Sequence, residues 1–108
     1  MARIRLRSAE ITDREAFHTQ FQRLVGLPEF YGRNMDAWID CMSSLRDGDG
    51  MTALVLGPDE LLEIEVPDVV ELRLRVPELF QDLVDCSALV NRRYRQTGQR
   101  PAIALVLE

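Results

Sequence analysis

Residues 27–41, LPEFYGRNMDAWIDC, predict a stiff loop that runs directly into a helix. Leu27 precedes Pro28, and the residue before a proline is disfavoured in the α conformation, so any preceding helix should end here. Gly32 predicts a turn that a residue with a Cβ atom would resist. Asn34 is expected to cap the helix, because its side-chain oxygen can accept a free N–H of the first turn. The rest of the chain is interpreted around this stretch.

The helix predicted from residue 35 to about residue 45 has an apolar face and an acidic face. At about 100° per residue, one arc holds the apolar side chains of Met35, Trp38, Ile39, Met42 and Leu45. The opposite side holds Asp36 and Asp40, one turn apart, with Ser43 and Ser44 beside them. The loop before the helix adds two aromatic rings that are expected to be exposed, Phe30 and Tyr31. The acidic face is either an ordinary solvated helix surface or a surface that offers two carboxylates to a partner.

The composition predicts one small domain over residues 1–108 and a partner that is not nucleic acid. The net charge is −5, and the 13 basic residues are all arginine. An acidic domain is a poor nucleic-acid binder and suits a basic partner instead. No apolar run approaches a membrane span, and the first ten residues lack the apolar region of a signal peptide. A cytoplasmic protein, monomeric when free, is therefore expected.

The pattern of strands and helices predicts an α/β fold with a small, mostly parallel sheet. Residues 2–7 and 61–66 alternate apolar and polar, as strands with one wet face do. Residues 102–107 are almost uniformly apolar, which is typical of a central strand covered on both faces. Residues 51–56 are β-rich and are predicted to add a further strand by forming a hairpin with residues 61–66.

Three helices are predicted besides the one after Asn34. The first begins at a cap on Thr12 or Asp13, extends to about residue 25 and is stopped by Gly26. The last begins at Pro77 and extends to about residue 96. Residues 69–75 are interpreted as a short helix, with a strand as the alternative, because their apolar residues also alternate.

The remaining polar clusters predict no catalytic or metal site. His18, the only histidine, lies beside an apolar helix face and is interpreted as structural. The turn at residues 46–50, RDGDG, begins like a calcium loop but lacks the downstream oxygen ligands. Arg92, Arg93 and Arg95 crowd the end of the last helix, where cations suit the helix dipole. Cys41 and Cys86 fit buried free thiols better than a disulfide. No cofactor is expected.

The stretch LPEFYGRNMDAWIDC resembles the barstar family, the intracellular inhibitors of barnase-type secreted ribonucleases. The shared pattern is Leu-Pro-Glu-aromatic-aromatic-Gly-x-Asn-x-Asp-Ala-x-x-Asp-Cys, and it is matched at residues 27–41. The resemblance continues back through the first helix to His18. Beyond residue 46 it rests on the order of elements and on the terminal strand.

The resemblance implies a three-stranded parallel sheet packed with helices, and a segment from Phe30 to Asp40 that enters the active site of a basic ribonuclease. Asp40 matches the family's principal anchor, a carboxylate in the position of a substrate phosphate, and Asp36 matches a second acidic contact. Phe30 matches an aromatic that packs on the enzyme, and Gly32 and Asn34 belong to the same contact loop. The full set of expected partner-binding residues is Phe30, Tyr31, Gly32, Asn34, Asp36, Trp38, Ile39, Asp40, Ser43 and Ser44.

The chain departs from the family pattern at several positions. The aromatic ring before Asp40 lies at Trp38, one position earlier than in the family, and is followed by Ile39. An acidic contact on the last helix has no counterpart, because that region reads Asn91-Arg92-Arg93. These departures motivate the alternative that the chain is an interaction or regulatory module whose partner is not a ribonuclease. An enzyme is not expected, because neither aspartate has a histidine, metal ligand or nucleophile near it in sequence.

Overall fold

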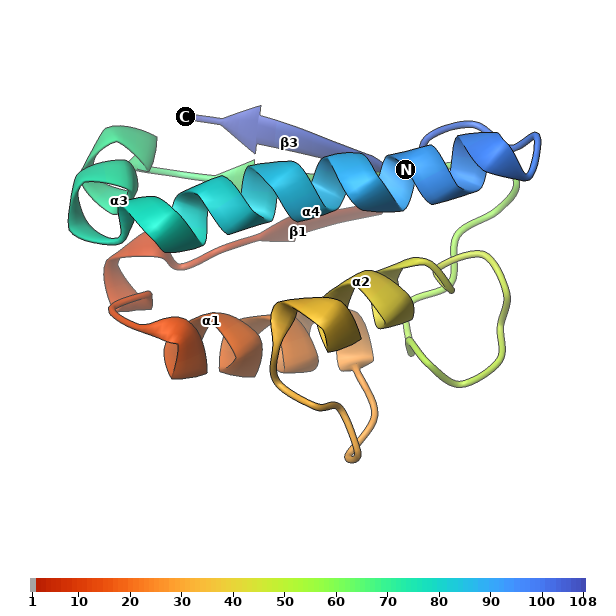
Figure 1. Cartoon of the computed structure of the whole chain (residues 1–108), viewed down its shortest axis with the longest axis horizontal. Helices are drawn as coiled ribbons and strands as arrows, with labels where there is room; N and C mark the ends of the chain where they lie inside the picture. Colours follow the sequence, from red (N-terminus) through yellow and green to blue (C-terminus); the bar gives the residue numbers. More distant parts are fainter. Residues whose placement is uncertain (1) are drawn as a thin grey trace.

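The structure is a computed structural model that describes residues 2–108 as a three-stranded sheet with helices packed on one face (Figure 1). The strands are β1 (Ala2–Arg5), β2 (Leu62–Val66) and β3 (Ile103–Leu107). The helices are α1 (Arg14–Phe21), α2 (Met35–Met42), α3 (Val69–Arg75) and α4 (Pro77–Gln96), with a 3₁₀ turn η1 (Ser8–Glu10) and a π-helical turn η2 (Gln22–Gly26). The predicted α/β class with a three-stranded parallel sheet is confirmed. Within residues 2–108, no helix is long and apolar enough to cross a bilayer.

The sheet has the strand order β1-β2-β3, and both pairs of strands are parallel. The register aligns Ile4 with Ile64 and Ile64 with Leu105, so these side chains share the inner face that packs against the helices. The prediction that residues 102–107 form the central strand is wrong, because β3 lies at an edge and β2 lies in the centre. An apolar run reports the absence of polar side chains and does not report how many faces of the strand are covered.

The outer face of the sheet is covered by ion pairs rather than by a second layer of helices. Arg3 on β1 contacts Glu63 on β2 at 2.8 Å. Arg5 contacts Glu65 at 3.6 Å and the side chain of Glu108, after β3, at 2.9 Å. Parallel sheets normally bury both faces. The alternation in β1 and β2 follows from this one-sided burial, as the sequence predicts.

Residues 51–56 do not form the predicted hairpin strand. Instead, the segment donates its backbone N–H groups to a carbonyl at the end of η2 and to one in the turn after α2. The N–H of Ala53 bonds to the carbonyl of Gly26 at 2.9 Å, and the N–H of Leu56 bonds to the carbonyl of Leu45 at 2.7 Å. Helix ends leave such carbonyls without intrahelical partners. The prediction of a strand is therefore wrong, because the hydrogen-bond partners of this segment do not lie on a neighbouring strand.

The local helix signals are confirmed with small changes. The side chain of Asp13 accepts the N–H of Ala16 at 2.9 Å, so it is the cap of α1. The helix continues as the π-helical turn η2 and stops at Gly26, whose φ is +76°. Residues 69–75 form a helix, α3, rather than the alternative strand. Helix α4 has Pro77 in its first turn and ends at Gln96, as predicted.

Replacing Gly26 by alanine is expected to lower the free energy of unfolding by about 2–4 kcal/mol. Gly26 has a left-handed φ, and a Cβ atom there would lie 2.4 Å from the Cβ atom of Ala53. Gly98→Ala is the matched control, since Gly98 has a φ of +79° but nothing within 4 Å of the added atom. In the control, the free energy of unfolding should fall by only about 1 kcal/mol, which is the cost of the backbone conformation alone. Urea unfolding, followed by the fluorescence of buried Trp38, measures the stability of both variants. Equal losses of stability in Gly26→Ala and Gly98→Ala would contradict the steric argument.

Candidate partner-binding surface

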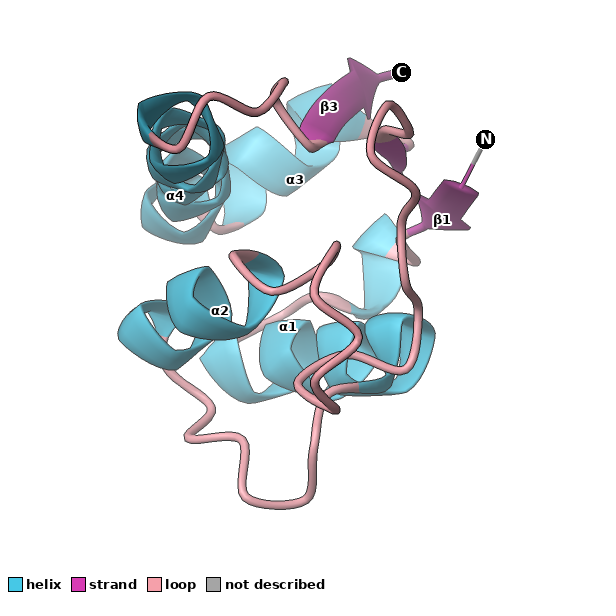
Figure 2. Cartoon of the chain, turned by 90° about the vertical axis from the view of Figure 1, so that its right-hand side faces the viewer, coloured by secondary structure: helices cyan, strands magenta, loops and turns pink. Residues whose placement is uncertain are grey.

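Residues 27–44, called here the loop–helix segment, comprise the connection after α1 and the whole of α2. Figures 1 and 2 show its loop extending away from the sheet, between α1 and α2. The predicted cap is confirmed, because Oδ1 of Asn34 accepts the N–H of Ala37 at 2.8 Å. The helix therefore starts directly at the end of the loop, and the two parts present one continuous surface.

The outer surface of the loop–helix segment carries two carboxylates and one aromatic ring. Asp36 and Asp40 are exposed on α2, and Phe30 is 76% exposed in the loop. Gly32 and Asn34 are also exposed, whereas Ser43 and Ser44 are half-buried. Seven of the ten expected partner-binding residues are therefore accessible at least in part.

The other three expected residues point inward. Tyr31 is 5% exposed, so the expectation that both loop aromatics are exposed is wrong for this residue. Trp38 is fully buried and Ile39 is 8% exposed. The Trp38 ring packs edge-on against Phe21 of α1, with the ring centroids 5.5 Å apart. These side chains hold the segment on the core and do not face outward toward a partner.

A buried hydrogen bond fixes the loop from beneath. The hydroxyl oxygen of Tyr31 lies 2.5 Å from Nδ1 of His18 on α1. Burial, together with the positive charges of Arg33 and Arg14, lowers the pKa of His18 to about 4. Burial also raises the pKa of Tyr31. At neutral pH both groups are therefore uncharged, and the pair is a neutral internal anchor.

Arg33 ties the loop to α1, and sequence reasoning missed it. Its guanidinium donates to Oε1 of Gln22 at 2.9 Å, to Oγ1 of Thr19 at 2.7 Å and to both the carboxylate and the carbonyl of Glu15. Arg33 also adopts the left-handed conformation, with a φ of 54°. The turn predicted at Gly32 thus occurs one residue later, and no local pattern marks an arginine for this role.

Gly32 is constrained by space rather than by a left-handed φ. A Cβ atom on Gly32 would lie 3.3 Å from the Cβ atom of Ala37, a tighter contact than most Cβ atoms make. The loop backbone therefore passes close to the first turn of α2. This close approach favours a residue with no side chain at position 32, three residues before the first residue of α2.

The far end of α2 is fixed by Tyr94 of α4. Its hydroxyl donates to the carbonyl of Met42 at 3.0 Å and accepts the N–H of Leu45 at 2.9 Å. Arg46 lies over the Tyr94 ring, 5.0 Å from the centroid, and donates to the carbonyls of Gly57 and Arg100. Both ends of the loop–helix segment are thus held by side chains from other helices.

Asp40 makes an ion pair within the chain. Its Oδ1 lies 2.9 Å from Nη1 of Arg93 on α4, and the same nitrogen donates to Oγ of Ser43 at 3.3 Å. The side chains of Asp40 and Arg93 remain 66% and 51% exposed. Sequence reasoning assigned Arg93 to the dipole of its own helix, whereas the structure places its charge at the end of α2.

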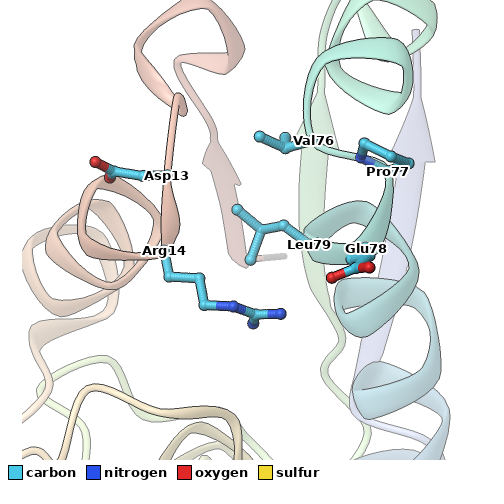
Figure 3. Close-up of a pocket in the computed structure, with 6 residues that line it drawn as sticks. All are labelled: Asp13, Arg14, Val76, Pro77, Glu78 and Leu79. Atoms are coloured by element: carbon cyan, nitrogen blue, oxygen red, sulfur yellow. The ribbon is translucent and has the colours of Figure 1, made fainter.

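A pocket elsewhere in the protein does not supply a competing site. It has a volume of about 350 Å³ and lies where α1 and α4 begin, between Arg14 and Leu79 (Figure 3). Two of the three charged side chains that line it have partners within the chain: Asp13 caps α1, and Arg14 donates to Asp82 at 2.8 Å. Among residues 2–108, no group of three or more histidine, cysteine or acidic side chains is placed to hold a metal ion.

The stability of the protein should fall in acid through His18. Above about pH 6.5 the imidazole is neutral in both the folded and the unfolded chain. Between about pH 6.5 and 4 only the unfolded chain binds the proton, so the free energy of unfolding should fall by up to about 3 kcal/mol. Below about pH 4 the folded protein binds this proton too, and the loss of stability due to His18 does not increase further.

Urea unfolding at several pH values, compared with His18→Gln, measures this effect. The variant retains every carboxylate, so the difference between the two pH profiles isolates the imidazole. The wild-type profile should be steeper between pH 6.5 and 4. Parallel profiles would show that protonation of His18 does not contribute to the pH dependence of stability.

A comparison with protein families agrees with the fold described above. The family model described as Barstar (barnase inhibitor) matches residues 1–106 of the 108-residue chain. The comparison with curated proteins returned no match. The family match covers the strands and the helices, and it includes the entire loop–helix segment. The chain belongs to the Barstar family.

Proposed function

We propose that this protein inhibits a barnase-type ribonuclease by placing its loop–helix segment in the active site of the enzyme. One observation carries the proposal: two exposed carboxylates and an exposed aromatic ring lie on a segment whose reverse side is fixed to the core. The family description names inhibitors of such enzymes and supports this role. The proposal assigns the chain no chemistry of its own.

The mechanism is substrate mimicry by charge. A ribonuclease binds an anionic chain, so its cleft carries basic groups. Asp40 would occupy the place of a substrate phosphate, and Asp36, one helical turn earlier, would make a second acidic contact. The net charge of −5 would attract a basic enzyme from a distance and raise the association rate. Phe30 would add apolar contact area at the rim of the charged site.

The supports beneath the segment favour tight binding. Binding costs conformational entropy whenever a loop must be ordered at the interface. Here the His18–Tyr31 bond and the four hydrogen bonds of the Arg33 guanidinium order the loop before any partner arrives. Most of the ordering cost is therefore met when the protein folds.

Asp40→Ala is expected to weaken binding to barnase, used as a basic ribonuclease probe, by at least about 2 kcal/mol, or roughly 30-fold. The reason is the loss of the carboxylate that stands in for phosphate. Glu71→Gln, on exposed α3, is the control for overall charge and should change binding little. Ribonuclease inhibition assays and calorimetry at low and high salt measure the effect, which should diminish as salt rises. A failure to inhibit any of a panel of basic ribonucleases would count against the proposal.

Phe30→Ala should separate binding from folding. The ring is 76% exposed, so its removal should change the free energy of unfolding by no more than about 0.5 kcal/mol. Its removal should nevertheless weaken binding by about 1–2 kcal/mol, because interface aromatics contribute much of the binding energy. Equal losses in stability and in binding would show that the ring supports the fold instead.

The second candidate function is a Barstar-fold interaction module with a partner that is not a ribonuclease. The ion pair between Asp40 and Arg93 favours it, because the principal carboxylate is already matched within the chain. A non-nuclease partner captured by the wild-type protein, and lost when Asp36 and Asp40 are both replaced by asparagine, would support this alternative.

A further inference from the structure

We propose that Arg93 is a specificity-determining residue that decides which basic clefts Asp40 can enter. This inference rests on the proposed function and adds a property of the partner. The partner would present an acidic side chain to Arg93 beside the cationic group that receives Asp40. A cleft that is basic throughout would be disfavoured.

Arg93 lies on the surface that a partner would cover. It comes from α4, 53 residues after Asp40, yet Nη1 lies 2.9 Å from Oδ1 of Asp40. Both side chains are about half exposed or more, so the pair lies at the surface of the protein. An enzyme that engages Asp40 must therefore meet Arg93 as well.

The guanidinium group of Arg93 has a defined position. Besides Asp40, it donates to Oγ of Ser43 at 3.3 Å, and Ser43 in turn donates to the carbonyl of Ile39 at 2.6 Å. These groups belong to the last turn of α2, where the helix dipole favours a positive charge. Arg93 thus has three separate reasons to remain at this end of the acidic helix.

A partner would encounter different charges at the two carboxylates of α2. Among residues 2–108, Asp36 has no ion-pair partner, whereas Asp40 is paired with Arg93. The two carboxylates of α2 are therefore not equivalent. At Asp40 a basic cleft meets a nearly neutral pair, and insertion would bring the Arg93 charge against the cations of the cleft. A carboxylate in the partner would remove that repulsion, and partner choice is a difference between such affinities.

The experiment compares Arg93→Gln with Arg92→Gln, using barnase as the probe. Arg92 is the adjacent exposed residue of α4, and within residues 2–108 no ion pair involves it. Both substitutions remove one positive charge from the same helix. Arg93→Gln should tighten binding about tenfold relative to wild type, whereas Arg92→Gln should change it by less than about threefold. The gain should diminish as salt rises from about 50 to 500 mM, since its origin is electrostatic.

The possible outcomes separate this inference from the proposed function. Binding by the wild type with equal effects of the two substitutions, or weaker binding by Arg93→Gln, would overturn the inference and leave the inhibitor role in place. If only the Arg93→Gln variant binds barnase, the inference is supported, and Arg93 prevents the wild-type protein from binding barnase. The absence of binding by the wild type and both variants would overturn the inference and the proposed inhibition of barnase-type enzymes together. Thermal unfolding of each variant establishes that the fold is intact.

Discussion

The hydroxyl group of Tyr94 fixes the position of the acidic helix, and the arrangement of the surface depends on it. It bonds to the carbonyl of Met42 and to the N–H of Leu45, so α2 ends against α4 at a defined place. Burial raises the pKa of Tyr94, which keeps the hydroxyl protonated and able to donate at neutral pH. Arg46 stacks on the same ring and joins it to the segments that lead into β2 and β3. One buried aromatic residue thereby sets the distance between Asp40 and Arg93.

The opposite end of the segment combines backbone strain with strong local support. A left-handed conformation costs a residue with a Cβ atom about 1–2 kcal/mol, and Arg33 adopts it at the tip of the turn. The four donor contacts of its guanidinium to α1 offset that cost. Strain of this kind persists only where the surrounding contacts over-determine it. The loop is therefore held in one shape before binding, and exposed Phe30 is presented by a backbone that has little freedom.

Sequence reasoning succeeded where a few neighbouring residues decide the structure. The caps at Asp13 and Asn34 and the stop at Gly26 require only local hydrogen bonds or a local φ. The fold class followed from the spacing of apolar residues, and the two exposed carboxylates followed from helix geometry. The misplaced features depend on distant partners. Tyr31 turns inward because its hydroxyl group forms a hydrogen bond with His18, thirteen residues earlier. Residues 51–56 bond to backbone carbonyls that follow helices instead of joining a strand. The ion pair of Asp40 joins residues 53 positions apart, and no local pattern encodes it.

Under the proposed function, the surface would separate attraction at long range from discrimination at contact. The excess of acidic residues acts over a Debye length of about 8–10 Å and draws in any basic protein, whatever the details of its cleft. The Asp40–Arg93 pair is nearly neutral at that distance and contributes little to the approach. The charges of Asp40 and Arg93 interact separately with a partner only when it comes within a few ångströms. Under the proposed function, the same helix would attract basic enzymes as a class and would still disfavour some of them, because the charge of Arg93 acts separately only when the surfaces are in contact.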